Sequence, residues 1–215
     1  MIKAIIFDMY ETLVTLKSDE LYFDPQVFAD ENVDEKIILD VWNSKEYDRT
    51  IGNTTLEDHI TLVLKENGKY SEELFTYIFK KRYEARRIPF NSMHKDIIPM
   101  LKTLKDKGIK IGLISNSFSE EMDTIKESIL YPYFNATCFS FEEHIKKPDP
   151  EIFRRIIEKL GVSYDECIYV GDGGSDELEA AKNLGMKALK ANWYVNRNLE
   201  FVELNNPLEV IQYVE

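Results

Sequence analysis

The chain has 215 residues, a formal net charge of -12, 44% hydrophobic residues and 31% charged residues. This composition is typical of a globular protein and excludes disordered and fibrous classes, while the acidic excess argues against binding nucleic acid, whose phosphates repel such a surface. The amino terminus lacks a signal-peptide pattern, and no apolar run is long enough to span a bilayer. Cys138 and Cys167 are expected to be free thiols. We therefore expect a cytoplasmic protein without a membrane partner.

Along the chain, a short apolar run over residues 3–7 predicts a buried parallel strand that ends at Asp8. From about Tyr22 to Arg87 apolar residues recur with helical spacing, and no strand pattern interrupts them. We interpret residues 17–88 as an all-helical insertion, with hinges near 15–18 and 88–91. Residues 1–16 and 89–215 form the domain that carries it.

After Pro89, strand and helix patterns alternate regularly. Helices are expected near residues 94–107, 120–128, 150–160 and 176–183, strands near 109–114, 135–139, 167–170 and 186–189, and a short helix at the end. Such alternation predicts an α/β fold with a doubly wound parallel sheet.

Polar residues follow each of the predicted strands. They are Asp8 after the first, Ser115 and Asn116 after the second, Lys147 in the loop after the third, and Asp172 after the fourth. Because ligands of open parallel sheets bind beyond the carboxyl ends of the strands, we expect these side chains to share one site. Two carboxylates there suit Mg²⁺, Lys147 adds positive charge, and the hydroxyl and amide can donate to phosphate oxygens.

Four short motifs in this order carry a family resemblance. They are Asp8-Met9-Tyr10-Glu11-Thr12-Leu13, Ser115-Asn116, Lys147-Pro148-Asp149-Pro150 and Gly171-Asp172-Gly173-Gly174-Ser175-Asp176-Glu177. Together they resemble the motifs of the haloacid dehalogenase-like hydrolase superfamily over nearly the whole chain. The resemblance implies a Rossmann-like core with a helical cap inserted after the first motif.

The resemblance also implies roles for single residues. Asp8 would be the nucleophile that forms an aspartyl-phosphate, which water then hydrolyses. Asp172 and the backbone carbonyl of Tyr10 would hold Mg²⁺ together with Asp8. Either Asp176 or Glu177 would complete the metal shell, with Glu177 favoured. The expected substrate is a small phosphorylated metabolite.

Tyr10 departs from the pattern of most phosphatases in the superfamily, which carry a second Asp at this position as general acid and base. A phenol with an ordinary pKa of about 10 is poorly matched to moving protons at neutral pH. The neighbouring carboxylate of Glu11 is a candidate substitute.

Two alternative functions follow from this departure. A Tyr at this position also resembles the pattern of the metal-independent 2-haloacid dehalogenases. Such an enzyme would need a cation for the substrate carboxylate, which could come from Arg49, Arg86 or Arg87. We expect these arginines, however, to lie on a solvated helix surface. A non-catalytic binding or regulatory protein on the same fold is the other alternative. The last motif resembles the metal-binding form found in the superfamily, which favours the phosphatase.

Overall fold

The structure is a computed structural model that describes residues 1–17, 27–28 and 31–214. Its described strands are β1 (Ala4–Phe7), β2 (Lys110–Ser115), β3 (Ala136–Phe139), β4 (Cys167–Gly171), β5 (Lys187–Ala191) and β6 (Val202–Leu204). They form one sheet in the order β3-β2-β1-β4-β5-β6, and every neighbouring pair is parallel. The predicted α/β fold with a parallel sheet is confirmed.

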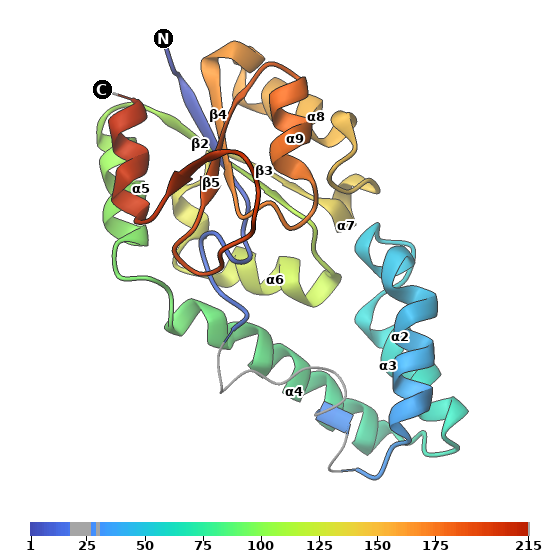
Figure 1. The fold of residues 1–215 in the computed structure, drawn as a ribbon. Helices are drawn as coiled ribbons and strands as arrows, with labels where there is room; N and C mark the ends of the chain where they lie inside the picture. The colour runs from blue at the N-terminus through green and yellow to red at the C-terminus, as the bar shows by residue number, and fades with distance from the viewer. Residues whose placement is uncertain (18–26, 29–30, 215) are drawn as a thin grey trace.

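Helices cover both faces of this sheet, as Figure 1 shows. The helices that follow β1 in sequence are α2 (Glu35–Thr50), α3 (Leu56–Glu66), α4 (Glu72–Asn91), α5 (Ile97–Asp106), α6 (Ser119–Glu127), α7 (Ser140–Glu143), α8 (Pro150–Leu160) and α9 (Glu177–Asn183), with 3₁₀ turns at Tyr131–Tyr133, Tyr164–Glu166 and Pro207–Tyr213. Helices α5 and α6 pack on one face, and α8 and α9 pack on the other.

The strands are apolar because both of their faces are buried. In β1, Ile5 and Phe7 belong to the core under α5 and α6, whereas Ala4 and Ile6 belong to the core under α8 and α9. Side chains alternate across a strand, so a continuous apolar run supplies both layers. The register of β1 between β2 and β4 places Asp8 at the middle of the carboxyl edge of the sheet.

Helices α2, α3 and α4 lie outside these two layers and share a hydrophobic core of their own. It includes Ile38 of α2, Leu56 and Val63 of α3, and Ile78 of α4. Figure 1 shows α2 and α3 side by side and set apart from the sheet, with the long α4 leading back to it. The described residues between β1 and α5 contain helices and no strand.

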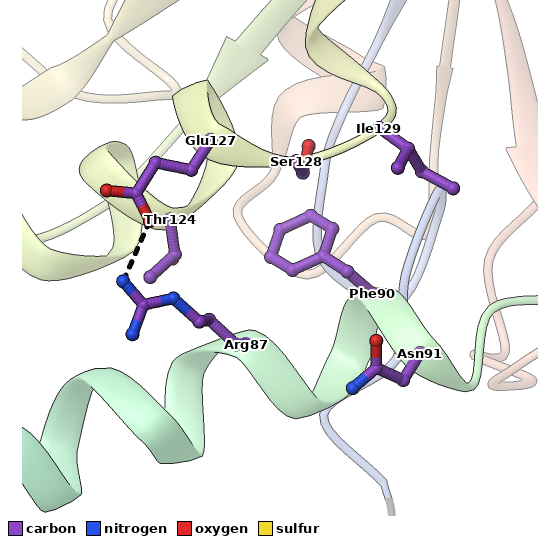
Figure 2. Close-up of a pocket in the computed structure, with 7 residues that line it drawn as sticks. All are labelled: Arg87, Phe90, Asn91, Thr124, Glu127, Ser128 and Ile129. Carbon is purple, nitrogen blue, oxygen red and sulfur yellow. Dashed lines mark hydrogen bonds and ion pairs between the residues drawn. The ribbon is translucent and has the colours of Figure 1, made fainter.

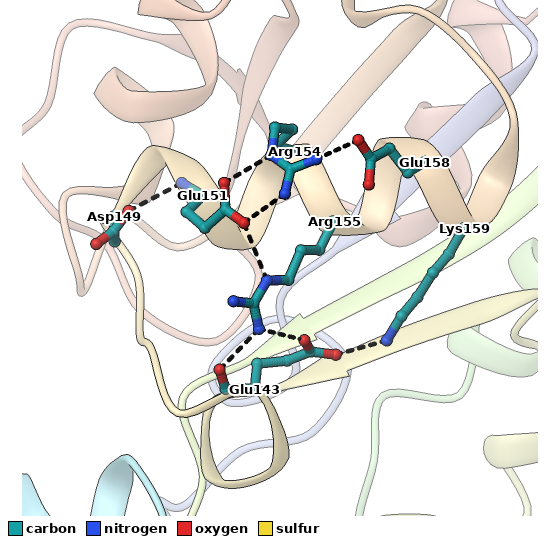
Figure 3. A network of polar contacts seen from close by, with 7 residues as sticks. All are labelled: Glu143, Asp149, Glu151, Arg154, Arg155, Glu158 and Lys159. Carbon is teal, nitrogen blue, oxygen red and sulfur yellow. Dashed lines mark hydrogen bonds and ion pairs between the residues drawn. The ribbon is translucent and has the colours of Figure 1, made fainter.

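The helix boundaries follow local chemistry. Helix α8 begins at Pro150 after Asp149, whose carboxylate accepts a hydrogen bond of 2.9 Å from the backbone N–H of Glu151, as Figure 3 shows. An N-cap Asp followed by Pro in the first turn is a favoured helix start. Gly161 ends the helix with φ 64°, a conformation that glycine adopts without strain.

The structure differs from the sequence prediction at β6 and at Pro89. The predicted final strand is followed by another, β6, which pairs with β5 and has two exposed residues out of three. Helix α4 continues through Pro89 to Asn91, so the predicted second hinge is helical. The predicted start of the helical periodicity near Tyr22 and the residue Ser18 of the first hinge lie outside the described residues. In the described part of the chain, no helix is long and apolar enough to cross a membrane.

Candidate active site

Asp8 lies directly after β1 and forms a buried ion pair with Lys147. The Lys147 Nζ is 2.5 Å from Oδ1 of Asp8 and 3.2 Å from the hydroxyl of Tyr169, a β4 residue. Lys147 is 2% exposed and Asp8 is 8% exposed. A buried ammonium is stable only beside an opposite charge, so this pairing holds the cation of Lys147 against the Asp8 carboxylate.

Asn116 and Ser115 lie beside this pair at the end of β2. The side-chain amide of Asn116 donates to the Lys147 carbonyl at 3.1 Å and accepts from the Lys147 N–H at 2.8 Å. Asn116 therefore fixes the backbone that carries the lysine. The Ser115 hydroxyl is fully buried and has no hydrogen-bond partner among the described residues. A buried hydroxyl normally has a partner, so a ligand oxygen would satisfy it.

Three carboxylates meet at the carboxyl edge of the sheet. Oxygens of Asp8, Asp172 and Glu177 lie within 4.8 Å of one another, and all three residues are buried. Burial without a compensating cation is costly for three such groups, whereas Mg²⁺ binds carboxylate oxygens readily. The donor set fits a hard divalent cation.

The loop after β4 orients two of these carboxylates. The Glu177 carboxylate accepts from the N–H groups of Gly173 at 2.8 Å and Ser175 at 2.6 Å, and Asp172 accepts from the Gly174 N–H at 3.0 Å. Asp176, the other predicted ligand from this loop, is exposed and lies outside the three-carboxylate cluster.

The surroundings of Asp8 shift the pKa of its carboxyl group. Burial raises the pKa of Asp8 to about 7, Lys147 opposes this, and the negative charges of Glu177 and Asp172 add to the rise. Loss of hydration and nearby like charges both disfavour an ionised carboxylate. A bound divalent cation would reverse the effect of the like charges.

Tyr10 points its hydroxyl into a buried region near α6. The hydroxyl has no hydrogen-bond partner among the described residues. Burial raises the pKa of Tyr10 well above its usual value, and the Glu121 carboxylate adds to this rise. Glu11 is already engaged, because its carboxylate accepts from the Thr15 hydroxyl and the Leu16 N–H, both at 2.8 Å.

The expectation that the arginines lie on a solvated surface is wrong for Arg49 and Arg86, which are both buried. Arg49 pairs with Glu120 of α6 at 2.8 Å, and Arg86 lies 3.3 Å from Glu121. These partners lie far along the chain, so helical spacing in the insertion did not reveal them. Arg87 is exposed as expected and pairs with Glu127.

Two residues beside the candidate site were not predicted from the sequence. Arg197 donates from Nε to Oδ2 of Asp172 at 2.8 Å, although it lies 25 residues later in a loop without a motif. Arg82 of α4 shares Glu120 with Arg49, with its Nε 3.0 Å from Oε1 of Glu120. A pattern of single residues does not show contacts of this kind.

A separate pocket lies between α4 and α6. Figure 2 shows its lining, which comprises Arg87, Phe90, Asn91, Thr124, Glu127, Ser128 and Ile129, around a volume of about 260 Å³. None of these residues belongs to the carboxylate cluster, so this pocket is distinct from the candidate active site.

Comparisons with known proteins agree with this architecture. The sequence pattern of the haloacid dehalogenase-like hydrolase family matches residues 2–185. The chain is 30% identical to the putative pyrophosphatase PpaX of Clostridium perfringens, over 100% of this chain and 98% of that protein. It is 24% identical to the glyceraldehyde 3-phosphate phosphatase of Methanopyrus kandleri, over 88% and 84% of the two chains.

A similar fold occurs in the solved structure of a 2-haloacid dehalogenase from Pseudomonas syringae. The TM-score is 0.75 at 18% identity, over 100% of this chain and 98% of that one. The family match and the parallel sheet together define a hydrolase of the α/β fold class. The chain belongs to the haloacid dehalogenase-like hydrolase family.

Proposed function

We propose that this hydrolase is a Mg²⁺-dependent phosphatase that transfers the phosphoryl group of a small phosphate ester first to Asp8 and then to water. The observation that carries the proposal is the meeting of Asp8, Asp172 and Glu177 around one point, with Lys147 bonded to Asp8. Relatives named as phosphatase and pyrophosphatase support it.

In the proposed reaction an oxygen of Asp8 attacks phosphorus, and the bond from phosphorus to the ester oxygen breaks. The bonding electrons leave with that oxygen, which takes a proton from water. Water then attacks the same phosphorus, and the bond between phosphorus and the Asp8 oxygen breaks. This releases inorganic phosphate and restores the Asp8 carboxylate, while the proton lost by the attacking water neutralises the hydroxide left by the first step. Lys147 holds Asp8 in place and offsets negative charge on the transferring group. The unpartnered Ser115 hydroxyl donates to a phosphate oxygen.

Asp8, Asp172, Glu177 and the backbone carbonyl of Tyr10 would hold the magnesium ion. When bound, Mg²⁺ supplies fixed positive charge that offsets the clustered carboxylates and the substrate phosphate. Glu177 suits the role better than Asp176, since its buried carboxylate belongs to the cluster.

The insertion is proposed to act as a cap that sets substrate choice. The charges acting on Tyr10 come from Glu121 and Glu120 of α6 and from Arg86 and Arg82 of α4. Because α4 belongs to the insertion, the insertion reaches the surroundings of the segment after Asp8. A cap that closes would control the access of water to the covalent intermediate.

The experiment is a screen of phosphorylated metabolites and p-nitrophenyl phosphate for phosphate release, with Mg²⁺ and with EDTA. Release should require Mg²⁺ and should disappear in Asp8→Asn, because an amide cannot attack phosphorus. Asp165→Asn, which removes an exposed carboxylate away from the site, is the matched control and should retain activity. Full activity of Asp8→Asn would exclude its role as nucleophile.

The dehalogenase alternative is favoured by Tyr10 alone, since displacement of halide from carbon needs no acid for the leaving group. The same protein preparation should therefore be assayed for halide release from 2-haloacids without metal. Halide release without Mg²⁺, together with no phosphate release, would replace the phosphatase proposal.

A further inference from the structure

Asp172 already has a cationic partner within the protein. The Arg197 Nε donates to Oδ2 of Asp172 at 2.8 Å, and the Gly174 N–H donates to Oδ1 at 3.0 Å. The side chain of Asp172 is 4% exposed, whereas the side chain of Arg197 is 45% exposed. Both oxygens of a proposed metal ligand thus accept hydrogen bonds. One of these bonds comes from a positively charged side chain that is half-exposed to solvent.

The segment that carries Arg197 is anchored at Arg197 itself and earlier in the same loop. The buried Nζ of Lys190 donates to the Arg197 carbonyl at 2.5 Å and pairs with Glu203 at 2.6 Å. Earlier in the same loop, the Trp193 indole donates to the Thr12 carbonyl at 2.8 Å, which ties the loop to the segment after Asp8. The backbone at Arg197 is therefore fixed while its guanidinium remains half-exposed.

Two glycines of the last motif make room for this loop. A Cβ at Gly174 would lie 3.0 Å from Nη2 of Arg197, and a Cβ at Gly173 would lie 2.2 Å from a methyl carbon of Leu199. Gly173 also has φ +86°, which favours glycine. The close passage of Arg197 over Asp172 thus depends on the absence of side chains at the motif itself.

We propose that Arg197 is an internal counter-cation that competes with the divalent cation for Asp172 and so weakens the affinity of the site for Mg²⁺. This inference rests on the proposed function, because it requires Mg²⁺ at Asp172. A guanidinium bonded to Oδ2 lowers the negative potential that attracts Mg²⁺, and the two cations repel each other across the same carboxylate. On metal binding, the exposed head of Arg197 moves toward solvent while Lys190 retains its backbone.

The test measures Mg²⁺ binding alone, by isothermal titration calorimetry on the full chain without substrate. Arg197→Gln should lower the dissociation constant roughly tenfold, because it removes one charge from the immediate neighbourhood of the ion. The gain should shrink as salt is raised, because Arg197 is half-exposed and its field is screened. Arg197→Lys keeps the charge but not the Nε–H bond, so its affinity should fall between the two.

Arg154→Gln is the matched control. Arg154 is an arginine of similar exposure on α8, where it pairs with Glu151 and Glu158 (Figure 3), and its replacement changes the net charge equally. Its Mg²⁺ affinity should equal that of the wild type. Unchanged or weaker binding in Arg197→Gln, with a wild-type melting temperature, overturns the inference. Absence of Mg²⁺ binding in the wild type would instead contradict the proposed function itself.

Discussion

In the proposed phosphatase reaction, Tyr10 limits how the leaving group can be protonated. Its hydroxyl is buried and has no partner among the described residues, and burial holds its pKa well above the usual range. The phenol therefore stays protonated and gives up its proton poorly. Glu11, the neighbouring carboxylate, is occupied by Thr15 and Leu16. Substrates whose leaving oxygen is stable as an anion should consequently react best.

Tyr10→Asp should restore a proton donor at this position. We expect kcat/KM for alkyl phosphates to rise by about 100-fold relative to that for aryl phosphates, since only the poorer leaving group needs the proton. The measurement is a plot of log kcat/KM against leaving-group pKa, which should become shallower in the variant. Tyr10→Phe is the control and should keep the wild-type slope. An unchanged slope in Tyr10→Asp would show that leaving-group protonation does not limit the reaction.

The pKa of Asp8 predicts how the proposed binding of Mg²⁺ depends on pH. Its pKa is raised to about 7 by burial and neighbouring carboxylates, so without metal it is mostly protonated at pH 6 and mostly ionised at pH 8. Metal binding must displace that proton, so the Mg²⁺ dissociation constant should be roughly tenfold higher at pH 6 than at pH 8. Calorimetry in buffers of different ionisation enthalpy should detect the released proton at pH 6. Asp8→Asn should bind more weakly and lose this pH dependence.

The backbone at the end of α2 accepts side-chain contacts from the segment around α7. The Ser140 hydroxyl donates to the Thr50 carbonyl at 2.7 Å, and a ring nitrogen of His144 lies 2.8 Å from the Ile51 carbonyl. Gly52 follows with φ +74°, and a Cβ there would lie 2.2 Å from the carbonyl oxygen of Phe141. Close approach of α2 to the segment around α7 therefore requires glycine at this position.

Gly52→Ala should destabilise the protein by more than about 2 kcal/mol, because it combines a left-handed backbone with a steric clash. Gly68→Ala is the matched control, since Gly68 has a similar φ of +64° but nothing lies within 4 Å of its Cβ. It should cost only about 1 kcal/mol from backbone strain. Urea unfolding followed by circular dichroism measures both. Equal losses of stability in the two variants would show that the backbone at Phe141 shifts to relieve the clash without a cost in free energy.

The helical insertion and the sheet domain are joined by buried ion pairs. Glu120 of α6 is fully buried and accepts from Arg49 of α2 and from Arg82 of α4 through the same oxygen. Arg49 also lies over the rings of Phe118 and Trp42, at 4.2 and 5.2 Å from their centroids. Because the carboxylate belongs to the core and the guanidinium groups belong to the insertion, the cluster couples the two parts.

Glu120→Ala should cost about 3–5 kcal/mol, because it removes the shared carboxylate from two buried guanidinium groups. We also expect α2–α4 to unfold before the sheet in this variant. Trp42 fluorescence, measured in a Trp193→Phe background because the chain has these two tryptophans, should then change at lower urea than the circular dichroism of the whole chain. Glu158→Ala removes an exposed carboxylate from Arg154 and should leave a single transition near that of the wild type. A single, unshifted transition in Glu120→Ala would contradict the coupling.

Local sequence was sufficient for most of the fold because the strands lie inside the molecule. Runs such as residues 167–170 are apolar throughout, since each of their two faces meets a helix layer. Strand β6 was not predicted because it lies at the edge of the sheet, where Val202 and Glu203 are exposed and the apolar run is absent. Pairing with β5, rather than composition, makes it a strand.

The position of Asp8, Lys147 and Asp172 at one edge of the sheet also followed from sequence, because parallel strands bring their carboxyl ends together. The choice between the adjacent acids Asp176 and Glu177 did not, since it depends on which side chain turns toward the N–H groups of the loop. Likewise, only folding buries Arg49 against Glu120, 71 residues away, and lays Arg197 across Asp172. Contacts between distant segments depend on packing, and no local pattern encodes them.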